Sequence, residues 1–291
     1  MATGSADSAA HRGPGAGRAR HHGGRPGHHC RLHRLAPTGG VCYFCYFRTF
    51  CFLTVHISSS SPAPALTRPP ELVVPRQLAI FGAGGLGREI LVLVRQLNAL
   101  RPTWELTGFY DDQPPATDLI HGLRYLGTAH DLNATPTPLA VAVAVGSSRS
   151  RAAVVGRLTS PWLSFPTLIH PGVSTESFQH LHIGPGCLIT QGCVLTTDIR
   201  LGRHVLLNLG CTVGHDAVLD DFCSLMPHAN VGGAAHLAEG VYLGTNATVL
   251  NQVRVGARTV LGAGAVAIRD LPADCTAVGV PARILTPPVT R

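Results

Sequence analysis

The chain has 291 residues, of which 45% are apolar, and a formal net charge of +7 at pH 7. Its length allows about two domains of ~100–200 residues each, and its apolar fraction excludes a wholly disordered chain. About +6 of the charge lies in residues 1–72, where eight arginines stand against two acidic residues, so the remainder is nearly neutral and no nucleic-acid partner is expected.

Residues 1–72 are predicted to form a disordered, low-complexity leader that is not necessarily part of the mature protein. Residues 1–40 are mostly Gly, Arg, His, Ala and Pro, and such a segment buries too little apolar surface to offset its ordering entropy. The apolar stretch 41–57 is short of the ~20 residues that cross a bilayer and holds Arg48 near its centre, so no membrane span is expected. A start-site artefact, a signal and an anchor all stay open for the leader.

Residues 73–164 predict an α/β domain of the Rossmann-like type. An apolar run from residue 77 leads into a glycine-rich turn and an amphipathic helix pattern. A second strand is expected over 104–112, and a third, fully apolar strand over 140–148. This strand–helix–strand order is typical of parallel sheets that are covered on both faces and bind nucleotides at the first turn.

The glycine turn and the end of the second strand are the predicted binding site for a nucleotide or a nucleotide sugar. Gly82, Gly84 and Gly85 allow close approach of the backbone, and the helix N-terminus offers free N–H groups to a phosphate. Asp111 and Asp112 can accept hydrogen bonds from ribose hydroxyls. Two alternatives stay open on these residues alone: NAD as the nucleotide, and glycines that serve only tight helix–strand packing.

The strongest pattern begins at Ile183, where an aliphatic residue recurs at every sixth position as far as Leu261. A small or β-branched residue lies four positions after each, and glycine often follows the aliphatic residue directly. A period of six fits a short strand plus a turn, and three such units close a triangular coil of about 18 residues. Residues 165–285 are therefore predicted to form a parallel β-helix, with glycine supplying unusual backbone angles at the turns and residues 269–285 capping the end.

The repeat also accounts for most of the cysteines. Cys187, Cys193, Cys211 and Cys223 occupy the small interior position and are predicted to be small hydrophobes, neither nucleophiles nor metal ligands. Reduced thiols suit a cytoplasmic protein, which is the expected location.

Since the interior is apolar, chemistry must come from outward residues at the turns. His215 points outward beside Asp216, and Gly233, 18 residues later, should lie one coil above it at ~4.8 Å. A base beside an unobstructed backbone N–H suits acyl transfer, because one group takes the proton of the nucleophile and the other holds the oxyanion. A neighbouring carboxylate favours the imidazolium that forms. The outward histidines interpreted as solvated surface residues are His204, His228 and His236.

Residues 77–285 resemble the sugar O-/N-acetyltransferases of the NeuD and PglD type, within the hexapeptide-repeat acyltransferases. The motifs that carry the resemblance are IFGAGGLGREI (80–90), FYDD (109–112), AVGSSRSR (144–151), PTLIHPGV (166–173), NLGCTVGHDAVLDDF (208–222), LGAGAV (261–266) and VGVPAR (278–283). The resemblance implies a left-handed β-helix, acetyl-CoA as co-substrate with no permanently bound cofactor or metal, and a sugar acceptor that is often nucleotide-linked. It also implies a homotrimer with active sites between adjacent prisms.

The same resemblance assigns roles to single residues. His215 is implied as the general base, Asp216 as the group that raises its basicity, and Gly233 as the backbone donor of the oxyanion hole. Asn208 matches a residue that helps to shape the acceptor site.

Three further positions are assigned to acetyl-CoA by resemblance. Thr245 and Ala263 match positions that line its groove and, being 18 residues apart, stack in one column. Ser224 falls where a relative has a histidine that contacts acetyl-CoA, which is a departure from the family. Leu86 is a second departure, because this position of the glycine turn is often a histidine.

The predicted function is metal-independent acetyl transfer, in which an amine or hydroxyl of a sugar attacks the thioester carbonyl of acetyl-CoA while His215 removes the proton. A zinc-dependent β-helix hydrolyase is one rival; it needs three convergent histidines, two of them as a His-x4-His pair that residues 183–265 lack. An NAD-dependent oxidoreductase with the β-helix as a scaffold is another, resting on the glycine turn and Asp111. A purely structural β-helix protein is the third.

Overall fold

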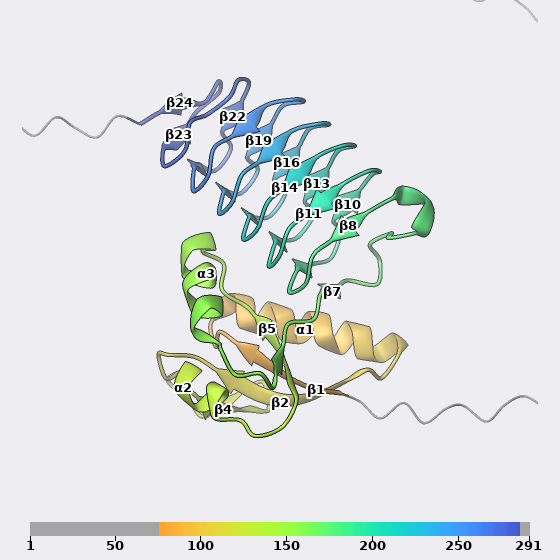
Figure 1. Ribbon diagram of the computed structural model, residues 1–291, viewed down its shortest axis with the longest axis vertical. Coiled ribbons are helices and arrows are strands. Elements are labelled where there is room, and N and C mark those ends of the chain that lie inside the picture. Colours follow the sequence, from red (N-terminus) through yellow and green to blue (C-terminus); the bar gives the residue numbers. More distant parts are fainter. Residues whose placement is uncertain (1–75, 286–291) are drawn as a thin grey trace, which may run out of the picture. The chain divides into compact units, whose positions relative to one another are not determined.

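The computed structural model describes residues 76–285, so the predicted leader lies outside the described residues. These residues belong to one compact unit of the chain. The first part of these residues forms a mostly parallel α/β sheet, and the rest form a stack of coils with short strands (Figure 1). None of the helices in this part of the chain is long and apolar enough to cross a membrane.

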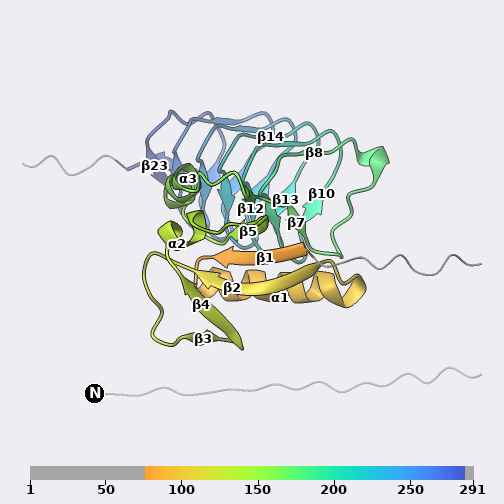
Figure 2. The same ribbon diagram turned by 60° about the horizontal axis from the view of Figure 1, so that its bottom comes forward.

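The α/β sheet has six strands, and all neighbours pair in parallel except the first two in the spatial order, which form an antiparallel edge (Figure 2). In spatial order the strands are β3 (Leu119–Ile120), β4 (Leu123–Gly127), β2 (Trp104–Tyr110), β1 (Arg76–Phe81), β5 (Leu139–Val143) and β6 (Leu163–Ser164). The helices are α1 (Gly85–Leu100), α2 (Ala129–Asn133) and α3 (Ser148–Arg157).

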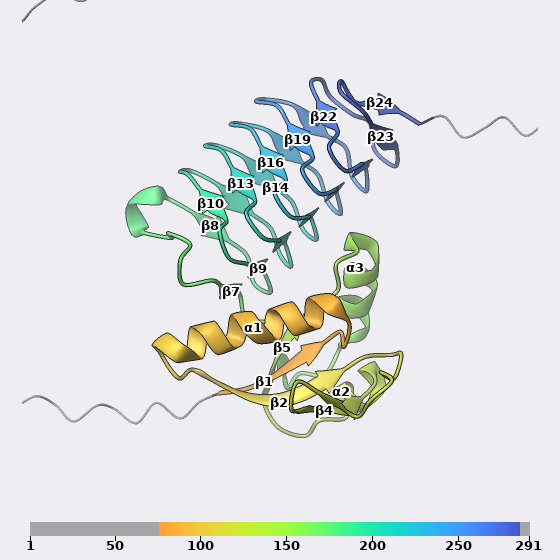
Figure 3. The ribbon, with the colours of Figure 1, turned by 180° about the vertical axis from the view of Figure 1, so that it is seen from behind.

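Burial follows the apolar pattern of this sheet. Every residue of β5 is buried, as expected for a strand covered on both faces. Helix α1 runs along the sheet (Figure 3) and buries Ile90, Leu91 and Val94 in the same apolar cluster as Leu78 of β1. The third strand is shorter than the predicted 140–148, because Ser147 ends the segment by capping α3, its hydroxyl accepting from the Ser150 N–H.

Three sheets form the sides of the coil stack, which we call faces A, B and C. Their strands pair in parallel, except that the last strand of face C is antiparallel to its neighbour. Face A contains β10 (Val194–Leu195), β13 (Thr212–Val213), β16 (Asn230–Val231), β19 (Thr248–Val249) and β22 (Val266–Ala267). Face B contains β8 (His182–Ile183), β11 (Arg200–Leu201), β14 (Val218–Leu219), β17 (His236–Leu237) and β20 (Arg254–Val255). Face C contains β7 (Leu168–Ile169), β9 (Leu188–Ile189), β12 (Leu206–Leu207), β15 (Ser224–Leu225), β18 (Tyr242–Leu243), β21 (Val260–Leu261), β23 (Thr276–Val278) and β24 (Arg283–Ile284).

The register of these sheets matches the predicted coil. In faces A and B each strand residue pairs in parallel with the residue 18 positions later, as Val194 does with Thr212 and Arg200 with Val218. The chain visits the faces in the order C, A, B, and a one-turn 3-10 helix (Ser177–Gln179) precedes β8. The aliphatic ladder forms one buried cluster inside the stack. The described residues therefore form a parallel β-helix whose corners we name C–A, A–B and B–C.

The prediction that glycine supplies unusual backbone angles at the turns holds only for other turn positions, and not for the glycines that directly follow the aliphatic residues. Positive φ occurs at Gly186, Gly192, Gly210, Gly240 and Gly264. The left-handed backbone belongs to the residue two positions after the directly following glycines, such as Asp216 (φ 58°) or Asn246 (φ 57°). The glycines themselves make room for the next coil: a Cβ on Gly214 would lie 2.7 Å from the nitrogen of Gly233. A side chain at Gly184, Gly214 or Gly244 would meet the backbone of the next coil, which the ladder of hydrogen bonds fixes.

The four cysteines of the repeat lie inside the stack, as predicted. Cys187, Cys211 and Cys223 are fully buried and Cys193 nearly so. Their thiols donate to carbonyl oxygens of the next coil, as from Cys187 to Gly202 at 3.1 Å. Burial raises the pKa of the Cys187 thiol to about 11 and that of Cys223 to about 12, so both stay protonated near neutral pH.

A buried arginine joins the α/β sheet to the coils. Arg151 of α3 is 1% exposed and donates to the carbonyl oxygens of Val145 (2.7 Å), His204 (2.9 Å) and Phe222 (2.9 Å). Burial lowers its pKa to about 10. The guanidinium thereby supplies donors to the carbonyls of two successive coils.

The interpretation of His204 as a solvated surface residue was wrong. Its side chain lies at the B–C corner and the residue is 5% exposed. The ring stacks on Phe222 at 5.4 Å between centroids and meets the edge of Phe165 at 5.1 Å. The physical reason is that segments outside the repeat cover this corner.

Candidate active site

A histidine–aspartate pair stands at the A–B corner. In the turn after β13, the Nδ1 atom of His215 lies 2.8 Å from the Oδ2 atom of Asp216, and both side chains are more than half exposed. Because a carboxylate only accepts hydrogen bonds, Nδ1 carries the proton in the neutral ring and Nε2 is left with a free lone pair. The pair can therefore act as a general base at Nε2.

Gly233 lies directly against this imidazole, in the coil above. The Ala234 N–H donates to the carbonyl oxygen of His215 at 2.7 Å. A Cβ on Gly233 would lie 2.5 Å from Nε2 of His215, so the ring occupies the space that the glycine leaves. The Gly233 N–H finds no acceptor within the described residues. The adjacency predicted from the 18-residue spacing is present, while the roles of the two groups stay predictions.

Three of the residues assigned to the acceptor and to acetyl-CoA lie at the C–A corner: Asn208, Thr245 and Ala263. Asn208 is 8% exposed, and its Oδ1 atom accepts from the Leu209 N–H at 2.7 Å. Thr245 and Ala263 are exposed and stack in successive coils, since Leu243 pairs with Leu261. The strands of face A separate this corner from His215, so one chain alone does not bring the two groups together.

Ser224 requires a correction. It is fully buried in β15, where its hydroxyl donates to the carbonyl oxygen of Gly146 at 2.9 Å and accepts from the Ser148 hydroxyl at 2.9 Å. This burial leaves no surface for acetyl-CoA to touch. The serine instead joins β15 to the segment before α3, a contact that a repeat pattern does not reveal.

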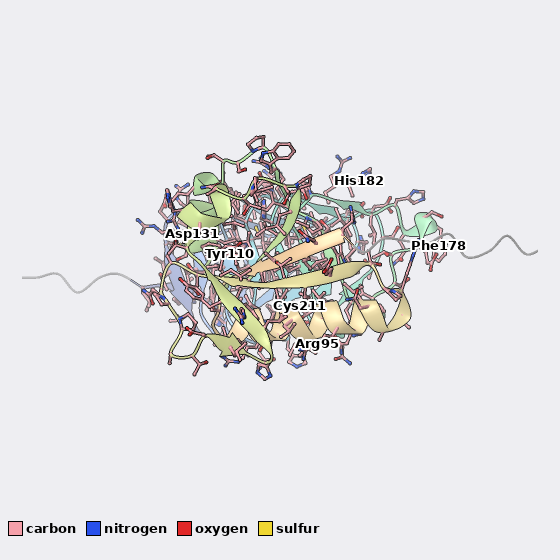
Figure 4. The ribbon with its side chains drawn as sticks, turned by 90° about the horizontal axis from the view of Figure 1, so that it is seen from below. Arg95, Tyr110, Asp131, Phe178, His182 and Cys211 are labelled. Atoms are coloured by element: carbon pink, nitrogen blue, oxygen red, sulfur yellow. The ribbon has the colours of Figure 1, made fainter. Side chains whose placement is uncertain are left out.

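The predicted nucleotide site lies at the carboxyl end of β1. Gly82 has a φ of 113°, and a Cβ there would lie 2.5 Å from the carbonyl oxygen of Ala144. Gly84 is the N-cap of α1 and Gly85 its first residue, and neither would meet a neighbour if it carried a Cβ. The backbone is thus open to a ligand at the start of α1. Figure 4 shows this part of the molecule from below, where Tyr110 marks the end of β2 and Arg95 lies further along α1.

The two aspartates after β2 have structural partners that the sequence did not reveal. The Oδ2 atom of Asp111 accepts from the Ala83 N–H at 2.8 Å and so ties the glycine turn to β2. Asp112 accepts from Arg157 of α3 at 2.5 Å and from the Ala129 N–H at 3.1 Å. Burial pushes the pKa of Asp112 up, but these two hydrogen bonds and the positive charge of Arg157 together outweigh it and hold the pKa below its usual value.

A family model and a solved structure point to the same family. Residues 77–158 match the family described as PglD N-terminal domain. The acetyltransferase domain of PglB from Neisseria gonorrhoeae, solved with acetyl coenzyme A, is 32% identical, with a TM-score of 0.66 over 73% of this chain and 100% of that one. The chain belongs to the PglD-type sugar acetyltransferases. The family predicted from the sequence is thereby confirmed.

Two further relatives are similar over most of their length. PerB from Caulobacter crescentus, solved with CoA and GDP-perosamine, is 27% identical with a TM-score of 0.65, over 72% of this chain and 97% of that one. GDP-perosamine N-acetyltransferase of Escherichia coli O157:H7 is 27% identical over 70% of this chain and 94% of the enzyme. By contrast, the chain spans less than half of the serine acetyltransferases it matches, 44% for the one from Synechococcus elongatus.

No group of three or more His, Cys, Asp or Glu side chains within residues 76–285 is placed to hold a metal ion.

Proposed function

We propose that this protein transfers the acetyl group of acetyl-CoA to an amine of a nucleotide-linked sugar, with His215 as general base. The observation that carries the proposal is the contact of the imidazole in the His215–Asp216 pair with Gly233, whose backbone N–H has no acceptor among the described residues. Relatives that cover this stretch were solved with acetyl coenzyme A, or with CoA and GDP-perosamine.

The chemistry follows from these three groups. The amine nitrogen attacks the thioester carbon, and Nε2 of His215 accepts the proton that the nitrogen loses. Negative charge then develops on the former carbonyl oxygen, where the Gly233 N–H can donate to it. Asp216 stabilises the imidazolium. When the C–S bond breaks, the imidazolium returns the proton to the CoA sulfur, and the products are the N-acetyl sugar and free CoA.

We assign the nucleotide to the α/β part, residues 73–164, which we interpret as Rossmann-like. Helices α1 and α3 both begin at the carboxyl ends of adjacent strands, β1 and β5, where α/β sheets bind ligands. The open backbone at Gly84 and Gly85 suits a diphosphate, and Asp111 and Asp112 stand at the neighbouring strand end. Residues 165–285, which we take to wind left-handed, carry the acetyl-transfer groups.

We infer that the working enzyme is a homotrimer. Asn208, Thr245 and Ala263 lie at the opposite edge of face A from His215, so a second copy must supply one of the two corners. Acetyl-CoA would run between the copies. Apolar side chains border face A in exposed positions, and a second copy would cover them: Val194 (53% exposed), Leu209 (42%), Leu250 (43%) and Ile268 (45%). Three copies around one axis close such a contact.

We also assign the protein to the cytoplasm, since the reduced thiols of the interior suit a reducing compartment.

A mass-spectrometric acceptor screen tests this proposal. The purified protein is mixed with acetyl-CoA and a panel of nucleotide sugars that carry either a free amine or only hydroxyls, and product masses are measured. We expect one acetyl group on amino sugars, with stoichiometric release of CoA. Acetylation confined to hydroxyl sugars would overturn the amine assignment, and stabilisation by NAD without any acetyl transfer would overturn the function.

A further inference from the structure

The column of the A–B corner continues past Gly233 to Asn251. Face A pairs Val231 with Val249, and the Gln252 N–H donates to the carbonyl oxygen of Gly233 at 2.9 Å. Asn251 therefore lies one coil above Gly233, just as His215 lies one coil below. Asn251 is exposed, and its carboxamide makes no hydrogen bond to any of the described residues.

Two side chains occupy the space left by the consecutive glycines Gly232 and Gly233. A Cβ on Gly233 would meet Nε2 of His215, at 2.5 Å. A Cβ on Gly232 would meet the Oδ1 atom of Asn251 and would lie 2.6 Å from its backbone nitrogen. The imidazole and the carboxamide thus converge, from below and from above, on the peptide that carries the Gly233 N–H.

The neighbouring B–C corner shows what an acidic residue does in this position. There a Cβ on Gly202 would lie 2.5 Å from the Oδ1 atom of Asp221, the same relation as between Gly232 and Asn251. The carboxylate of Asp221 accepts from the next N–H, that of Arg203, at 2.6 Å. An aspartate therefore captures the peptide N–H, whereas Asn251 leaves the Gly233 N–H without a partner.

We propose that the Asn251 carboxamide is the second donor of the oxyanion site. This inference rests on the proposed function. Rotation about the terminal torsion, whose profile is broad and two-fold, presents Nδ2 at the point where Oδ1 lies. As the amine attacks and the C=O bond becomes a C–O⁻ bond, the Gly233 N–H and Asn251 Nδ2–H both donate to that oxygen. A neutral amide is required there, because a carboxylate would hold the N–H and repel the oxyanion.

Steady-state kinetics of three variants test the proposal, with the acceptor that the wild type acetylates. Asn251→Ala removes a donor and should lower kcat by about 10²-fold, the usual cost of one oxyanion donor. Asn251→Asp should lower it further, since the carboxylate also captures the Gly233 N–H. KM for acetyl-CoA should change little in both Asn251 variants, because the hydrogen bond to the oxygen strengthens only in the transition state. Asp221→Asn is the matched control, and its kcat should stay near that of the wild type.

Two outcomes separate this inference from the proposed function. If the wild type acetylates a sugar while Asn251→Asp keeps a kcat within about threefold of it, the role of Asn251 is overturned and the proposed function stands. The role is also overturned if Asn251→Ala and Asn251→Asp lose activity only in proportion to a lowered thermal midpoint. If the wild type acetylates no sugar at all, the proposed function itself is overturned.

Discussion

Lowering the pH should lower the free energy of unfolding of the described fold, because His204 is buried as a neutral ring. This ring is buried against Phe222 and Phe165, and its Nδ1 atom has no hydrogen-bond partner among the described residues. Burial is the main cause that lowers its pKa, to about 4, and the positive charges of Arg151 and Arg203 act in the same direction while Asp221 opposes them. Native His204 is therefore neutral at pH values well above 4.

The sign follows from proton uptake in the two states. An unfolded histidine binds a proton below a pH of about 6.5, but native His204 does so only near pH 4. Between these values the unfolded chain holds more protons, so the free energy of unfolding falls as the pH falls. The two pKa values correspond to a loss of about 3 kcal/mol, complete once the pH is below about 4.

Urea unfolding followed by circular dichroism at several pH values between 7 and 4 measures this loss. His204→Phe keeps an aromatic ring in the stack and removes the titrating group, so its stability should fall less over the same range. Comparing each variant with itself across pH cancels any constant cost of the substitution. His228→Phe is the matched control, since both histidines have a positive φ (54° for His204 and 59° for His228) but His228 is exposed. Equal losses in the wild type and His204→Phe would refute the reasoning.

Three further substitutions probe the A–B corner and the glycines of the coils. Gly233→Ala places a Cβ 2.5 Å from Nε2 of His215, so the imidazole must move and kcat should fall by about 10²-fold or more; a kcat near that of the wild type would contradict this geometry. Asp216→Asn removes the carboxylate at Nδ1 and should lower kcat/KM at least about tenfold, with the thermal midpoint unchanged, since the pair is exposed. Gly244→Ala places a Cβ 2.6 Å from the nitrogen of Ala263 and should cost about 1–3 kcal/mol in urea unfolding, an effect absent if the coils can separate freely.

The β-helix could be predicted from the six-residue period, because the geometry of the coil produces that period. Each side of the triangle holds one inward aliphatic residue per strand, so spacing alone fixes which residues share a column. The contact between His215 and Gly233 follows from that arithmetic. Asn251 belongs to the same column, and the signal that could have identified it is its position 18 residues after Gly233.

Other features depend on information that the repeat does not carry. The left-handed position is occupied by residues as different as Phe222 and Ala234, so residue type does not identify it. Ser224 and His204 look like outward residues in the repeat, but they are buried, because segments before the repeat pack against face C and the B–C corner. A period of six predicts which way a side chain points, and does not predict what covers it.

The central claim is that His215 takes the proton of the attacking amine. The most direct test compares the rates of acetyl transfer by His215→Ala and His236→Ala. His236 lies on face B, is partly exposed, and has its Nε2 atom 2.9 Å from a carboxylate oxygen of Asp220. Our account predicts that kcat/KM of His215→Ala falls by about 10²–10⁴-fold while His236→Ala stays near the wild type. Rates for His215→Ala that match the wild type on a confirmed acceptor would contradict it.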